Sequence, residues 1–164
     1  MAANNREIER KYLLKALPPE AAAAPYVEID QGYLPGERIL ERIRRVRPAG
    51  AGAGGERAAP ARYIRTIKLG SGIERFEFEE DTTEAFFLAV WPLTRGRRVQ
   101  KRRYSVMAGS NEWVVDDFSD RTLVLAEIEL ERVDQAVVVP QWLGSAMASE
   151  VTDDPAFTNF RLAR

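Results

Sequence analysis

Charged and apolar residues alternate at every second position along several short segments of this chain of 164 residues. In "LVLAEIELE", Glu127 and Glu129 share one parity, while Ala126 and Ile128 share the other. Successive side chains of a β-strand point to opposite faces, so such a segment makes a strand with one ionic face and one apolar face. The pattern predicts a sheet that is packed on one side and charged on the other.

The other segments of this kind are short and bounded by Gly, Asp, Ser or Asn, which predicts hairpins and a mainly antiparallel sheet. They are "RYIRTIKLG", "ERFEFEE", "RRVQKRRYSV" and "NEWVVDDF". "ERILERIRRVR" also fits helical spacing through Ile39, Ile43 and Val46, and a strand is our interpretation. "RPAGAGAGGERAAPAR" predicts a flexible hairpin loop, and it lacks the Gly-Lys-Ser/Thr ending of a phosphate-binding P-loop.

Helical patterns are few. "DTTEAFFLAVWP" predicts a helix over about residues 82–91, capped by Asp81 or Thr82 and stopped by Pro92. A second short helix is expected in "ERVDQAVVV", before Pro140, and a third in the closing "DDPAFTNFRLAR".

Composition excludes several kinds of site. The chain has 24 Lys and Arg against 25 Asp and Glu, so a simple attraction to nucleic acid is disfavoured. It has neither Cys nor His, which excludes Ser-His-Asp catalysis and leaves only oxygen ligands for a metal. A general base must then be a carboxylate, a Tyr, a Lys or a metal-bound water. No apolar run approaches the length of about 20 residues that a membrane span needs, and we expect one cytoplasmic domain over residues 1–164.

The ionic faces carry charges of both signs. Lys101 and Arg103 share one parity, as do Arg42 and Arg44, and "ERFEFEE" places acids beside a base. If such a sheet curls with its ionic faces inward, about eight strands give a barrel with a polar interior that can hold a small ligand. Buried charges need water, ions or a ligand, so the interior should be an open, wet channel. Its cations match a compact polyanion such as a phosphate chain, and its carboxylates match Mg²⁺ or Mn²⁺.

Nine segments carry a resemblance to a known family. In chain order they are "EIERK", "QGYL", "RIRR", "TIK", "RFEFE", "QKRRY", "VVDDF", "LVLAEIEL" and the closing "VTDDPAFTNFRLA". The series resembles the motifs of the CYTH superfamily, the triphosphate tunnel metalloenzymes, in its short bacterial form. The resemblance covers nearly the whole chain. It implies a mainly β fold: an eight-stranded antiparallel closed barrel, or tunnel, with a polar interior and a few helices packed outside.

The resemblance also implies roles for particular residues. Divalent-metal ligands would be Glu7, Glu9, Asp116, Glu127 and Glu129. Phosphate-binding cations would be Lys11, Arg42, Arg44, Lys68, Arg75, Lys101 and Arg103. Glu77 and Glu79 would orient a cation or bind metal. Basic residues of the opposite parity are interpreted as surface charge; they are Arg10, Arg45, Arg65 and Arg102.

Tyr33 in "QGYL" has two interpretations. It is either a packing or gate aromatic, or a base or positioning group for the attacking water, helped by a nearby Lys that lowers its pKa. The catalytic candidates are therefore Tyr33 and Lys11. A third alternative is that metal alone activates the water.

The resemblance implies metal-dependent hydrolysis of a small-molecule triphosphate, with inorganic tripolyphosphate favoured. The alternatives are a thiamine triphosphatase or an ATP-acting phosphohydrolase, then a class IV adenylate cyclase, then a noncatalytic binder of nucleotides or polyphosphate. The cyclase group often has a His-Phe pair ahead of ExExK, and this chain has "NNRE" there. No nucleic-acid or membrane partner is expected, and a homodimer is left open.

Overall fold

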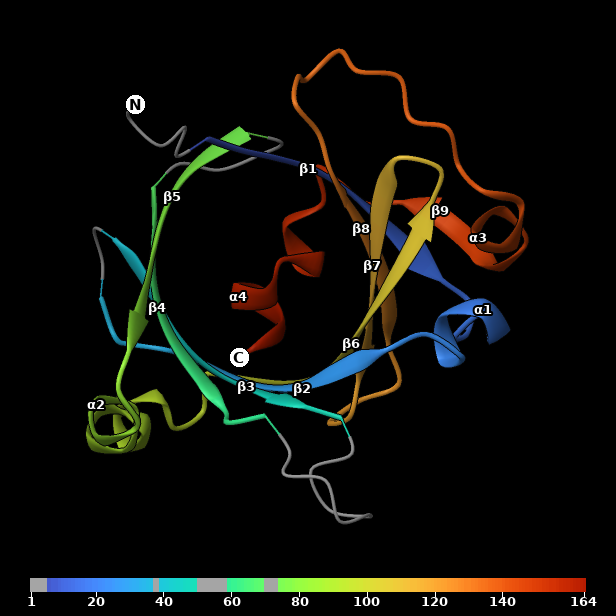
Figure 1. Cartoon of the computed structure of the whole chain (residues 1–164). Coiled ribbons are helices and arrows are strands. Elements are labelled where there is room, and N and C mark those ends of the chain that lie inside the picture. Colours follow the sequence, from blue (N-terminus) through green and yellow to red (C-terminus); the bar gives the residue numbers. More distant parts are fainter. Residues whose placement is uncertain (1–5, 37–38, 50–58, 70–73) are drawn as a thin grey trace.

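Nine antiparallel strands form one sheet in a computed structural model that describes residues 6–36, 39–49, 59–69 and 74–164 (Figure 1). The strands are β1 (Arg6–Leu14), β2 (Tyr26–Tyr33), β3 (Leu40–Pro48), β4 (Arg62–Leu69), β5 (Glu74–Thr82), β6 (Arg98–Ala108), β7 (Asn111–Phe118), β8 (Val124–Glu129) and β9 (Met147–Glu150). Their order is β5-β4-β3-β2-β6-β7-β8-β1-β9. The mainly antiparallel β fold is confirmed, and the sheet has one strand more than the predicted eight.

The additional strand is β9, which pairs with β1 alongside Tyr12, Leu13 and Leu14. Its four residues, "MASE", have no alternating pattern of their own. β1 also pairs with β5, from Arg6↔Phe76 to Ile8↔Glu74.

The helical segments are short. They are α1 (Pro19–Ala22), α2 (Glu84–Val90), η1 (Trp91–Thr94), α3 (Gln141–Ala146), η2 (Pro155–Phe157) and α4 (Asn159–Leu162), where η marks a 3₁₀-helix. Within the described residues, none has the length and apolar character that crossing a membrane requires.

Two of the three predicted helices are confirmed with changed ends. The Thr83 side chain caps α2 by accepting the Phe86 N–H at 3.1 Å, and the chain continues past Pro92 as a 3₁₀-helix. The closing segment is broken at Thr158 into η2 and α4. The helix predicted in "ERVDQAVVV" is wrong: these residues form a turn and an irregular stretch, and α3 begins only after Pro140. The β-branched run Val137, Val138 and Val139 loses side-chain freedom in a helix, which disfavours one here.

Two segments whose residue spacing also fits a helix are strands in the structure, because they pair with neighbouring strands. "EIERK" lies in β1, where Glu9 pairs with Glu129 and Lys11 with Glu127. "ERIRRVR" lies in β3, between β2 and β4. The β3–β4 hairpin is confirmed by this pairing, while residues 50–58 of its loop lie outside the described part of the chain.

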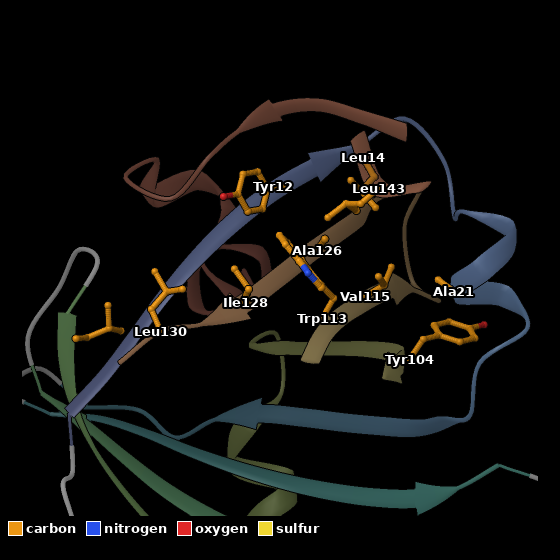
Figure 2. Packing of buried hydrophobic residues seen from close by; sticks show 11 residues of the cluster. Tyr12, Leu14, Ala21, Tyr104, Trp113, Val115, Ala126, Ile128, Leu130 and Leu143 are labelled. Atoms are coloured by element: carbon orange, nitrogen blue, oxygen red, sulfur yellow. The ribbon is translucent and has the colours of Figure 1, made fainter. Parts of the chain in front are cut away.

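The main apolar core lies on the face of β1 and β8 that turns away from the charges. It gathers Ile8, Tyr12, Trp113 and Ile128, and Leu143 of α3 covers it (Figure 2). The predicted parity is therefore confirmed: Ile8 and Tyr12 are in the core, while Glu7, Glu9 and Lys11 line a cavity on the opposite face.

Helix placement differs from the prediction in one respect. Figure 1 shows α1, α2 and α3 outside the curve of the sheet, as expected, but α4 lies within it. Phe160 of α4 meets the ring of Tyr33 edge-on, with 5.3 Å between the ring centroids. The closing segment is thus held by aromatic packing on the inner side of the sheet.

Candidate active site

A cavity of about 640 Å³ lies on the charged face of the sheet. Charged strand residues form one wall, which we call the strand wall, and residues 151–161 form the other, which we call the C-terminal wall. Nine of the predicted site residues line it: Glu7, Glu9, Lys11, Tyr33, Arg42, Arg44, Lys68, Arg103 and Glu127. Its size is ordinary for a small-molecule site.

Four predicted residues stand apart from that lining. Lys101 and Asp116 are buried behind the strand wall, at 1% and 0% exposure. Glu129 is exposed at the end of β8, beside its cross-strand neighbour Glu9. For Arg75 the structure describes only the backbone, which pairs with Glu7, and its side chain lies outside the described residues.

Opposite charges on the strand wall neutralise one another. The Lys11 Nζ lies 3.0 Å from Glu127 Oε1 and 3.4 Å from Glu9 Oε1. A second group of this kind comes from β3, β4 and β5. There Glu77 accepts from Arg42 at 2.8 Å and pairs with Lys68 at 2.5 Å. The wall is an interleaved network of acids and bases.

Asp116 is the centre of the buried part of this network. It accepts both Nε and Nη2 of Arg103, at 2.8 and 2.7 Å, and Lys101 Nζ at 2.6 Å. Burial alone raises the pKa of Asp116, but Arg103 and Lys101 outweigh it, so the pKa is lowered and the carboxylate is charged. With its oxygens engaged in this way, Asp116 holds the two cations in place; the structure does not put it among the carboxylates that face the cavity.

Arg44 differs from the other cations of the strand wall. It is 9% exposed, and its Nε donates to Gln31 Oε1 at 3.2 Å. No carboxylate in the described ranges lies within ion-pair distance of it. Burial, with Arg42 and Arg103 nearby, lowers the pKa of Arg44 to about 9, so the guanidinium is still charged at neutral pH. A buried cation among cations is stabilised by an anion.

Tyr33 is placed by the glycine that precedes it. A Cβ on Gly32 would lie 2.6 Å from Thr94 Oγ1, so only glycine lets η1 pack directly against β2. The Tyr33 ring is 2% exposed, and its hydroxyl accepts Gln31 Nε2 at 2.9 Å. Burial raises the pKa of Tyr33, and the neighbouring cations offset this only in part. Lys11 lowers this pKa, as expected of a nearby Lys, but desolvation is the larger effect and the net shift is upward.

The carboxylates nearest β1 have the donor chemistry for a hard divalent cation. Burial raises the pKa of Glu129, and so do the negative charges of Glu7, Glu9 and Glu77. A cation would relieve this repulsion, so the residues fit Mg²⁺ or Mn²⁺. In residues 6–36, 39–49, 59–69 and 74–164, no three carboxylates already converge as a metal's ligands do. Glu9 and Glu127 each place one carboxylate oxygen against Lys11.

The C-terminal wall was missed by reasoning from alternation, because it contains little strand. Thr152 accepts the Lys11 backbone N–H at 3.1 Å, and Asn159 Oδ1 accepts Lys101 Nζ at 3.0 Å. Arg161 also lines the cavity. The only signal was the resemblance of "VTDDPAFTNFRLA", which assigns no role to a side chain.

Similar proteins are known. An inorganic triphosphatase from Nitrosomonas europaea is 35% identical over 164 residues, and the match covers 96% of each protein. The crystal structure of the inorganic triphosphatase NE1496 has a TM-score of 0.62 and 30% identity, covering 96% of this chain and 93% of that one. No family model matches the chain.

A more distant structure shares the fold alone. It is a putative adenylate cyclase from Bacillus halodurans, with a TM-score of 0.51, 11% identity, and coverage of 84% of this chain and 96% of that one.

Proposed function

The chain belongs to the CYTH superfamily of triphosphate tunnel metalloenzymes, and from this premise we propose that it is an inorganic triphosphatase. It hydrolyses tripolyphosphate to pyrophosphate and phosphate. The inorganic triphosphatase of Nitrosomonas europaea, 35% identical over nearly the full length of both chains, supports this substrate.

The observation that carries the proposal is Arg44. Its buried guanidinium faces the cavity beside Arg42 and Arg103 and has no carboxylate partner in the described part of the chain. Fork-shaped guanidinium donors match phosphate oxygens, and several of them together match a chain of phosphates. A polyphosphate would give Arg44 the ion-pair partner that it lacks among the described residues.

We infer that the sheet closes round the substrate as an eight-stranded tunnel. The three residue pairs between β1 and β5 support closure, because they join the two ends of the strand order β5-β4-β3-β2-β6-β7-β8-β1. In this arrangement β9 is a ninth strand that pairs with the C-terminal part of β1, past the residues that pair with β5.

The reaction forms one bond and breaks one. The oxygen of water attacks a terminal phosphorus, and the bond from that phosphorus to the bridging oxygen breaks, so pyrophosphate leaves. Such a transfer needs positioning and neutralisation of charge more than covalent help from the protein. Arg42, Arg44, Lys68 and Arg103 hold the phosphates, and Asp116 fixes Arg103 from behind.

The proposed ligands of Mg²⁺ or Mn²⁺ are Glu7, Glu9, Glu127 and Glu129, with Asp116 placed behind the cations instead. When bound, the metal withdraws charge from the phosphate oxygens and lowers the pKa of a coordinated water. Lys11 lies between Glu9 and Glu127, so it would contact the phosphates from beside the residues that would hold the metal. Tyr33, a protonated phenol, serves to pack and position and does not act as a base.

The decisive experiment measures phosphate release from tripolyphosphate, ATP, thiamine triphosphate and pyrophosphate, each with Mg²⁺ or Mn²⁺. Cyclic AMP is followed alongside. Turnover should be fastest with tripolyphosphate and should stop when the metal is chelated. Faster turnover of ATP or thiamine triphosphate would move the assignment to those substrates, and no turnover at all would leave a noncatalytic polyphosphate binder. A homodimer and a cytoplasmic location stay predictions of the sequence.

A further inference from the structure

The cavity has a basic residue on the wall that the strands do not build. Arg161 belongs to α4 and lines the cavity from the C-terminal wall, while the other cations that line it come from strands. Asp153 and Asp154 are the charged residues that share this wall with it. One cation thus faces the strand wall from the opposite side.

Arg161 differs from most of the strand cations in its ion pairs. Lys11, Lys68 and Arg103 each have a carboxylate within 3.1 Å. Arg161 forms no ion pair with any carboxylate in residues 6–36, 39–49, 59–69 or 74–164, and its side chain is open to solvent. Like Arg44, it is therefore a cation of the cavity with no carboxylate partner among the described residues, and unlike Arg44 it is exposed to solvent.

The backbone that carries Arg161 is anchored on both sides. Thr158 caps α4 by accepting the Arg161 N–H at 3.3 Å, and Asn159 accepts the buried Lys101. Arg121 donates to the carbonyl oxygen of Leu162, just past Arg161. These bonds tie α4 to the sheet, so the guanidinium is presented to the cavity without first ordering a loose tail.

We propose that Arg161 is a further substrate-binding residue, which grips the polyphosphate from the side opposite the strand cations. This inference rests on the proposed function, because it assigns a second contact to the same anion. The C-terminal wall is then part of the binding site as well as its cover.

The test compares Arg161→Gln with Arg164→Gln. Arg164 lies on the same segment and carries the same charge, but its guanidinium stacks over Phe160, 4.3 Å from the ring centroid, and it does not line the cavity. We expect Arg161→Gln to raise the KM for tripolyphosphate about tenfold with kcat within about twofold. Arg164→Gln should stay near wild type, and Arg161→Lys should recover part of the loss.

Binding is measured separately by calorimetric titration of tripolyphosphate into metal-free protein, with thermal unfolding as a check on the fold. An unchanged KM and Kd in Arg161→Gln, or an equal loss in Arg164→Gln, would overturn the assignment. If the wild type hydrolyses nothing but binds tripolyphosphate, and Arg161→Gln binds it more weakly, the hydrolase proposal fails and the Arg161 contact stands. If the wild type hydrolyses tripolyphosphate and Arg161→Gln matches it, the hydrolase proposal stands and the Arg161 contact fails.

Discussion

The strand wall and the C-terminal wall enclose one cavity but are held by different forces. On the strand wall, each side chain projects from a strand whose pairing fixes its direction, as in β1 between β8 and β5. On the C-terminal wall, position depends on a few separate bonds to Lys11, Lys101 and Arg121, and on the packing of Phe160 against Tyr33.

The two walls therefore differ in how much stability is lost when one of their charged groups is removed. The strand wall collects acids and bases into a network in which the loss of one group leaves another charge buried, which is costly. The C-terminal wall has few charges, so its perturbation should loosen a short segment and leave the sheet intact. The following predictions test that contrast.

The largest effect is expected at the centre of the strand wall. Asp116→Asn leaves Lys101 and Arg103 without their shared negative charge, and we expect a loss of about 3–5 kcal/mol in the free energy of unfolding. Urea denaturation measures it. Asp117→Asn, the neighbour of opposite parity, is the control and should change stability by less than about 0.5 kcal/mol. Equal losses in the two variants would contradict the buried network.

Arg44→Gln should abolish most activity while leaving the sheet folded. Loss of a preorganised cation facing the phosphates predicts a fall in kcat/KM of about 10²-fold to 10³-fold with tripolyphosphate. Arg102→Gln removes the same charge from the outer face, near the ring of Tyr26, and should keep activity. A similar fall in both variants would mean that overall charge, and not the cavity, attracts the substrate.

Glu129→Gln should weaken the response to metal. The variant loses one of the proposed oxygen ligands, so the Mg²⁺ concentration for half-maximal activity should rise at least about tenfold. Glu28→Gln on β2, where Glu28 pairs with Arg47 at the surface, serves as the control. An unchanged Mg²⁺ requirement in Glu129→Gln would remove this residue from the metal site.

Asn159→Ala tests the C-terminal wall. The change removes an acceptor from the buried Lys101 and should cost about 1–2 kcal/mol. Hydrogen exchange should speed up at the amides of Leu162 and Ala163, which bond within the closing segment, while the strands keep their protection. Faster exchange throughout the sheet would show that the two walls are one cooperative unit.

Tyr33→Phe should have the smallest effect near neutral pH. It removes one hydrogen bond from Gln31, a loss of about 1 kcal/mol, and activity should stay within a few-fold because the phenol is not the base. Burial raises the pKa of Tyr33 above its ordinary value of 10.0, so the unfolded phenol loses its proton first as the pH rises. Wild-type stability should therefore fall more steeply above about pH 10 than that of Tyr33→Phe. A large loss of kcat at pH 7 would restore Tyr33 as a base.

Much of the strand wall could be predicted from parity. Glu7, Glu9 and Lys11 face the cavity, and Ile8 and Tyr12 face the core, as the alternation requires. Parity also explains why Asp116 was grouped with the cavity carboxylates. It lies on the same side as the cavity residues, but it is covered by Arg103, and a one-dimensional pattern contains no depth.

The sequence by itself determined the sheet, its charged face and the family, because a period of two is imposed by strand geometry and survives without knowledge of partners. Tertiary structure alone decided which charges meet and which stay uncompensated. Arg44 and Arg103 both point from their strands to the charged face and have the same chemistry. Yet Arg44 lies against Gln31, and Arg103 lies against Asp116. It also brought Asn159 and Arg161 to the cavity from the far end of the chain, since contacts across more than fifty residues depend on how the sheet curves and leave no local pattern.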